Sequence, residues 1–76
     1  MSITILAFAQ ARDVFGFSER SVECSAADTP RSIVERFSVS ADITFLRVAL
    51  DQEYCEWDTP VGQARELALI PPVSGG

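Results

Sequence analysis

The stretch that decides the fold is "ELALIPPVSGG", residues 66–76, in which an apolar run meets two prolines and ends on two glycines. Leu67-Ala68-Leu69-Ile70 is apolar at every position, a pattern typical of a strand that is buried on both faces. Pro71 has no backbone N–H to donate and therefore ends such a strand. We predict a last strand over residues 66–70 and a separate extended tail over residues 71–76.

The tail combines a stiff part with a flexible part. Pro71 and Pro72 favour an extended backbone, whereas Gly75 and Gly76 have no Cβ and can pass through a narrow channel. At ~3.3 Å per residue, residues 71–76 reach up to ~20 Å. Two glycines also occur together by chance or as a cloning remnant. The strand and the double proline before them favour a tail that enters a cleft in another protein.

The composition excludes several classes of function. With 76 residues we expect one small domain with one core and little room for an enclosed cavity. All six basic residues are arginines and the chain has no histidine. It therefore lacks a Schiff-base amine, the usual general base and the commonest metal ligand. We expect no metal, no bound cofactor and no catalysis by the chain alone.

Charge and hydropathy favour a protein partner. The net charge of -5 argues against nucleic acid and for a partner with a basic surface. No apolar run reaches the ~20 residues that span a membrane, and the start lacks the basic residues of a secretion signal. We expect a cytoplasmic location.

Cys24 and Cys55 lack the spacing of a zinc or redox motif. They are expected to be buried reduced thiols, with a disulfide as the alternative.

The first half of the chain predicts a strand pair and a helix. Residues 3–9 are rich in β-branched and aromatic types, and alternation places Leu6 and Phe8 on one face and Ile3, Ile5 and Ala7 on the other. Gly16 breaks the chain before a second strand over residues 20–24, which makes a first hairpin. Thr29-Pro30 supplies a capping hydroxyl and a proline at the first helical position. The apolar face of this helix, Ile33, Val34 and Phe37, is expected to cover the sheet.

The second half predicts a further hairpin, residues 47–50 and 53–57, around Asp51-Gln52, although Gln52 is an unusual residue for a tight turn. The order is then strand, strand, helix, strand, strand, strand. This order allows the last strand to pair parallel to the first. We expect an α+β domain over residues 1–70 with the β-grasp (ubiquitin-like) fold: a mixed sheet of about five strands crossed by one main helix.

Nearly the whole chain resembles the MoaD-like small subunits of molybdopterin synthase, which are ubiquitin-like sulfur carriers. The resemblance is carried by "FAQAR" at 8–12 with Gly16, "VALDQEY" at 48–54, "WDTP" at 57–60 and, most specifically, "ALIPPVSGG" at 68–76. Many relatives have Gly-Asp-Glu where this chain has Ala64-Arg65-Glu66. Gly62 is then the candidate to supply the turn before the last strand.

The resemblance implies chemistry at Gly76. In the family, an E1-like enzyme uses ATP to form an acyl-adenylate on the terminal carboxylate, and a persulfide donor then supplies sulfur to make a thiocarboxylate. Two small subunits flank a dimer of the large subunit, a heterotetramer that builds the dithiolene on cyclic pyranopterin monophosphate. The large subunit supplies the catalytic lysine, and the tail, Pro71, Pro72, Val73, Ser74 and Gly75, delivers the sulfur.

The resemblance also implies partner contacts at Phe8, Arg12 and Ile70. The alternative for Phe8 and Ile70 is ordinary core packing, and the alternative for Arg12 is a solvated side chain. Trp57 is expected in the core. Other functions with the same glycine ending are a sulfur carrier for thiamin synthesis or tRNA thiolation and a ubiquitin-like protein modifier. A binding module is the last alternative, and it predicts that Gly76 is dispensable.

Overall fold

In a computed structural model, which describes residues 1–37 and 45–72, the described chain forms five strands and two helices. These elements are β1 (Ser2–Ala7), α1 (Gln10–Phe15), β2 (Glu19–Glu23), α2 (Pro30–Glu35), β3 (Arg47–Leu50), β4 (Glu53–Cys55) and β5 (Glu66–Ile70). β5 has the bounds that the sequence predicts.

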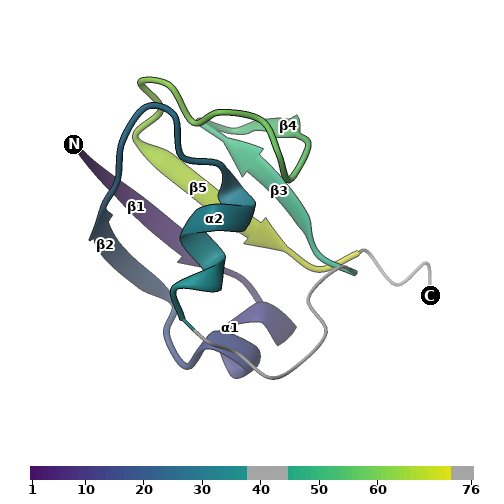
Figure 1. The fold of residues 1–76 in the computed structure, drawn as a ribbon. Helices are drawn as coiled ribbons and strands as arrows, with labels where there is room; N and C mark the ends of the chain where they lie inside the picture. The colour runs from purple at the N-terminus through teal and green to yellow at the C-terminus, as the bar shows by residue number, and fades with distance from the viewer. Residues whose placement is uncertain (38–44, 73–76) are drawn as a thin grey trace.

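The strands form one mixed sheet in the order β2-β1-β5-β3-β4. β5 lies at its centre, parallel to β1 with Ile5 beside Leu67, and antiparallel to β3. α2 crosses one face of the sheet, and α1 lies beyond the end of β1 (Figure 1). The β-grasp prediction is therefore confirmed.

The core lies between α2 and the sheet. Leu67 and Leu69 of β5 are fully buried, as are Ile5 of β1 and Ile33 of α2. The strand alternation predicted for residues 3–7 is confirmed, because Ile3, Ile5 and Ala7 all belong to this core. Trp57 and Phe37 pack against it from the margin, as expected.

The start of α2 follows from local chemistry. The Thr29 hydroxyl accepts a hydrogen bond from the backbone N–H of Ser32 at 3.1 Å, and the Ser32 hydroxyl accepts one from the backbone N–H of Thr29 at 2.8 Å. This reciprocal pair satisfies N–H groups that a helix start leaves without partners. Pro30 occupies the first helical position, which confirms the predicted start.

The predicted first hairpin is wrong in its connection. The first strand ends at Ala7 rather than at residue 9, and α1, which was not predicted, precedes β2. Ala9 has φ 48° and ψ −119°, and the N–H of Ala11 donates to the carbonyl of Phe8 at 2.9 Å. These angles are those of the first central residue of a type II′ turn, which reverses the chain directly after Phe8.

Replacing Ala9 with glycine is expected to stabilise the fold by about 1 kcal/mol, because glycine adopts this positive φ without the steric cost that alanine carries. Thermal unfolding of Ala9→Gly should show a higher Tm than the parent. Ala11→Gly, within α1, is the matched control and should lower Tm. A lower Tm for Ala9→Gly as well would contradict the turn conformation.

The second hairpin is confirmed, although its second strand ends at Cys55 rather than at residue 57. Its turn explains how Gln52 is accommodated. Asp51 and Gln52 both have positive φ, 50° and 72°, as a two-residue type I′ turn requires. The strands β3 and β4 pair Ala49 with Tyr54.

Cys24 and Cys55 are not joined in a disulfide. Burial is the main cause that raises the pKa of the Cys55 thiol, which keeps it in the unreactive thiol form.

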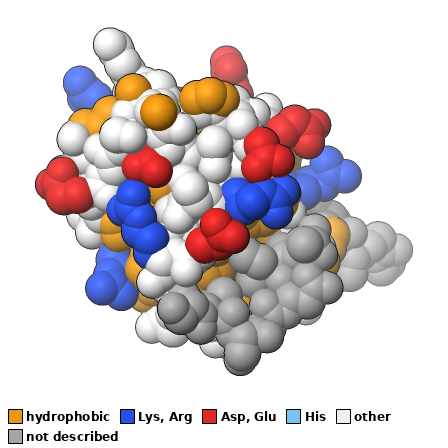
Figure 2. All heavy atoms as spheres, in the orientation of Figure 1, with side chains coloured by type: hydrophobic (Ala, Val, Ile, Leu, Met, Phe, Trp, Pro, Cys, Tyr) orange, Lys and Arg blue, Asp and Glu red, His pale blue; other side chains and the backbone are white. Residues whose placement is uncertain are grey.

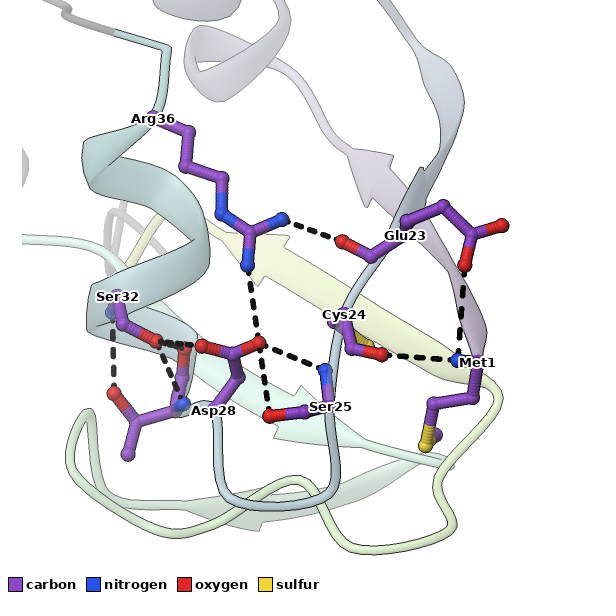
Figure 3. A network of polar contacts seen from close by, with 8 residues as sticks. Met1, Glu23, Cys24, Ser25, Asp28, Ser32 and Arg36 are labelled. Atoms are coloured by element: carbon purple, nitrogen blue, oxygen red, sulfur yellow. Dashed lines mark hydrogen bonds and ion pairs between the residues drawn. The ribbon is translucent and has the colours of Figure 1, made fainter.

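A polar network joins the end of β2 to α2 (Figure 3). Asp28 is its centre: the carboxylate accepts hydrogen bonds from the Ser25 backbone N–H at 2.8 Å and the Ser32 hydroxyl at 3.1 Å. Arg36 reaches the same carboxylate at 3.0 Å and also donates to the carbonyl of Glu23. Asp28 thereby fixes the connection from β2 to the helix that covers the core.

Asp28→Asn is expected to lower Tm at neutral pH. The Ser25 N–H bond, the Ser32 hydroxyl and Arg36 together hold the pKa of Asp28 below its ordinary value of 3.8. A lowered folded-state pKa stabilises the fold above the unfolded pKa, and this contribution is lost as pH falls through the folded pKa. The Tm difference between parent and variant should therefore be present at pH 7 and shrink as the pH falls below 3.8, the ordinary pKa of this carboxyl, and through its lower folded-state pKa.

The control for this measurement is Asp13→Asn, which makes the same charge change on the exposed surface of α1. It should leave the pH dependence of Tm unchanged. A Tm difference for Asp28→Asn that is equally large in acid would show that the ionised carboxylate is not the stabilising species.

Candidate functional site

The face of the sheet opposite α2, here called the open face, carries none of the described helices. Cross-strand register places Leu6 of β1, Ala68 of β5, Ala49 of β3 and Tyr54 of β4 in one row across it. Phe8 and Ile70 follow on the same face, one pleat nearer the start of the tail. The sheet thus presents an apolar strip that crosses four strands.

The open face is hollowed along this strip. Ala49 and Ala68 are 3% and 5% exposed and form the floor, because their methyl side chains are the shortest in the row. Phe8 and Tyr54 are 45% and 68% exposed and rise at the margins. The complete lining is Leu6, Phe8, Ala49, Gln52, Tyr54, Glu66, Ala68 and Ile70.

Two of the predicted contact residues come together here. Phe8 and Ile70 both line the depression, and the N–H of Phe8 donates to the carbonyl of Leu69 at 3.3 Å. Neither belongs to the core beneath α2. Their role as partner contacts remains a prediction, but they lie where one would be made.

Arg12 is placed differently. It is exposed on α1, beyond the end of β1, and does not line the depression. The structure therefore does not join Arg12 to the surface that Phe8 and Ile70 share, and its predicted contact would need a partner that also reaches α1.

The tail begins at this same end of the sheet. β5 runs from the centre of the open face directly into Pro71, which is half-buried, and Pro72, which is exposed. Val73, Ser74, Gly75 and Gly76 lie outside the described residues. A partner seated on the open face would therefore have the start of the tail beside it.

Tyr54 was not predicted as a site residue, although it is the most exposed of the large apolar side chains among the described residues. The sequence signal for the position of Tyr54 is the length of the turn that precedes it. Once Asp51-Gln52 is a two-residue turn, Tyr54 must pair with Ala49 and must share its face.

The turn before β5 is supplied by Gly62, as the sequence suggested. Gly62 has φ +60° and donates its N–H to the carbonyl of Ala26 at 3.0 Å. The Asp51 carboxylate accepts hydrogen bonds from the N–H groups of Arg65 and Glu66 at 2.9 and 3.0 Å. These bonds tie the β3–β4 turn to the start of β5, so the Gly-Asp-Glu departure leaves the strand in place.

A second depression lies at the β3–β4 edge of the sheet and is lined by Leu46, Arg47, Val48, Tyr54, Cys55, Glu56 and Trp57. Figure 2 shows acidic and basic side chains interspersed over the face that carries α2. Within residues 1–37 and 45–72, no cluster of His, Cys, Asp or Glu is arranged to hold a metal ion. No helix in these ranges is long and apolar enough to cross a membrane.

Comparison with known proteins identifies a family that matches most of the chain. Residues 5–76 match the model of the ThiS family. The molybdopterin synthase sulfur carrier subunit of Arabidopsis thaliana is 28% identical over 81 aligned positions, which cover all of this chain and 84% of that protein.

Solved structures support the architecture. SAMP1 from Haloferax volcanii superposes with a TM-score of 0.76 at 24% identity, covering all of both chains. A putative molybdopterin converting factor, subunit 1, from Pyrococcus furiosus gives a TM-score of 0.75 at 19% identity, covering 96% of this chain and 99% of that one. At these identities the likeness establishes the shared fold.

Proposed function

Because the chain belongs to the ThiS family, we propose that it is a ubiquitin-like sulfur carrier and that it serves as the small subunit of molybdopterin synthase. The observation that carries the choice of pathway is the match of all of this chain to 84% of a relative named molybdopterin synthase sulfur carrier subunit. The ending "PPVSGG" supports the same choice. The open face and the strand that leads from it into Pro71 give this role a docking surface beside a tail.

The reacting group in this proposal is the carboxylate of Gly76. It attacks the α-phosphate of ATP on an E1-like enzyme, pyrophosphate leaves, and an acyl-adenylate forms. The outer sulfur of a persulfide donor then displaces AMP and forms an acyl disulfide. A thiol of the activating machinery attacks the donor's sulfur, forms a disulfide with it and releases the thiocarboxylate. Glycine suits this step because a residue without a Cβ lets the backbone pass through a tight channel.

The large subunit supplies what this chain lacks. With no lysine and no histidine, the chain has no general base of the usual kind for the transfer to cyclic pyranopterin monophosphate. The large subunit would contribute the catalytic lysine and bind the open face through Phe8 and Ile70. We propose the heterotetramer of the family, two small subunits on a dimer of large subunits, in the cytoplasm.

The alternatives share the fold and the tail but differ in the acceptor. A carrier for thiamin synthesis or tRNA thiolation forms the same thiocarboxylate and gives it to another enzyme. A protein modifier instead forms an isopeptide bond through Gly76. Since this chain has no lysine, it builds no lysine-linked chains on itself, although it could be attached to other proteins.

The test is intact mass spectrometry of the protein from its own host, with and without the E1-like enzyme, followed by reconstitution with the large subunit. The proposal expects sulfur in place of one terminal oxygen, only when the activating enzyme is present, and molybdopterin only when the large subunit is added. Formation of the thiocarboxylate without production of molybdopterin would assign the protein to another sulfur pathway. A conjugate on a foreign lysine, without thiocarboxylate, would identify a modifier.

A further inference from the structure

The depression on the open face is apolar at its floor and polar at one end. Ala49 and Ala68 make the floor, and Glu66 and Gln52 line the end farthest from the tail. Glu66 shares the open face with Ala68 because the intervening Leu67 points into the core. Its side chain is half-buried, so a partner covering this face would desolvate the carboxylate.

The backbone of Glu66 is held at both of its polar groups. Its N–H donates to the Asp51 carboxylate at 3.0 Å, and its carbonyl accepts from the N–H of Asp51 at 3.0 Å. These bonds fix the position from which the Glu66 side chain extends over the open face. The carboxylate is therefore available at one end of the depression without being needed for the turn.

We propose that the depression receives one lysine or arginine side chain of the large subunit, with its methylene stem over Ala49 and Ala68 and its cationic head at Glu66. This inference rests on the proposed function. Long basic side chains bury an apolar stem and direct a charged head to a polar partner, and a carboxylate paired with such a head forms the stronger, charge-assisted hydrogen bond.

Other occupants fit the depression less well. An aromatic or aliphatic side chain would match the floor but would leave the Glu66 carboxylate desolvated and without a partner, which is costly. The net charge of -5 also favours a cationic partner surface. Arg47, the basic residue of the open face beside Ile70, lies about four residues or ~13 Å along the sheet from Glu66. Its repulsion directs an incoming cation toward Glu66.

Such a contact would also orient the tail. Phe8 and Ile70 anchor the partner at the tail end of the open face, and a cation at Glu66 would anchor it at the opposite end of β5. Two separated contacts fix the direction of β5 on the partner, and hence the direction in which Pro71 leads toward the large subunit.

The test compares two variants that make the same charge change. Glu66→Gln removes the proposed partner of the cation, whereas Glu53→Gln removes a carboxylate on β4 that shares the α2 side of the sheet with Leu50. Affinity for the purified large subunit is measured by calorimetry at low and high salt. Glu66→Gln should bind about tenfold more weakly and show a reduced salt dependence. Glu53→Gln should stay within about twofold of the parent.

A third variant tests the floor independently of the charge. Ala49→Val fills the depression with a residue that strands favour, and it should also weaken binding about tenfold. Thermal melts confirm that each variant folds. Equal affinities for Glu66→Gln and Glu53→Gln, or unchanged affinity for Ala49→Val, would overturn the inference while leaving the sulfur-carrier role intact. Failure of the parent protein to bind the large subunit would instead overturn the proposed function and this inference with it.

Discussion

Deleting Gly76 is expected to abolish thiocarboxylate formation and molybdopterin production, with a loss of a hundredfold or more in rate. The shortened chain still ends in a glycine carboxylate, that of Gly75, so its chemistry is unchanged. Its reach is shorter by ~3.3 Å, and a misplacement of about 1 Å at a reacting centre can cost a hundredfold.

The same deletion should leave docking and stability nearly unchanged. The surface proposed to bind the large subunit lies on β1, β3, β4 and β5, and the core lies beneath α2. The described residues that form this surface and this core all precede Pro71. The assay supplies ATP, the E1-like enzyme and a sulfur donor, and follows thiocarboxylate by mass, with calorimetry on the large subunit alongside.

An extension by one residue after Gly76 is the matched control for tail length. It should also fail, because the carboxylate then belongs to a residue beyond the activating site. Normal sulfur transfer by the deletion variant would show that Gly76 is dispensable and would contradict its assignment as the reacting residue. Loss of docking together with sulfur transfer would show that the tail contributes to binding itself.

The central strand and the main helix were predictable because each carries its own boundary signal. The apolar run of β5 stops at a proline, and α2 starts at a threonine that caps it and a proline that fits its first position. The parallel pairing of β5 with β1 followed from the order of the elements. These are local signals that tertiary contacts reinforce.

The helix α1 could not be predicted in the same way. It has six residues and no side-chain cap at its start, and it follows Ala9, whose positive φ is uncommon for any residue but glycine. Without that turn, Phe8 is indistinguishable from another strand residue. The place of Phe8 at the margin of the open face depends on a backbone conformation at Ala9 that an alanine in the sequence does not indicate.

The site was only partly predictable for a related reason. Phe8 and Ile70 lie far apart in the sequence and meet only because β1 and β5 are parallel neighbours. The face of Tyr54 depends on the length of the turn at Asp51-Gln52, since a shift of one residue in register moves a side chain to the other face. The predicted turn at Asp51-Gln52 gives this register, but Gln52 is not typical of such a turn, and the exposure of Tyr54 was not inferred from it. Glu66 carries no separate motif at all.

The combined substitution of Phe8→Ala with Tyr54→Ala is expected to weaken binding to the large subunit by about a hundredfold or more, since a central aromatic anchor contributes ~1–3 kcal/mol. Both rings stand on the open face, and at 45% and 68% exposed they contribute less to folding than core residues do. They flank the floor that Ala49 and Ala68 form, so a partner covering that floor must bury both rings. Calorimetry of the double variant with the large subunit gives the loss of affinity.

Conservative variants separate burial from other effects of these rings. Tyr54→Phe keeps the buried ring and should bind nearly as well as the parent, and Phe8→Leu should lose less than Phe8→Ala because it retains most of the apolar side chain. Thermal melts of each variant distinguish a lost contact from a lost fold. If the folded double variant bound the large subunit with unchanged affinity, docking would have to use the face that carries α2. The placement of Phe8 and Ile70 next to the start of the tail would then have no role in sulfur delivery.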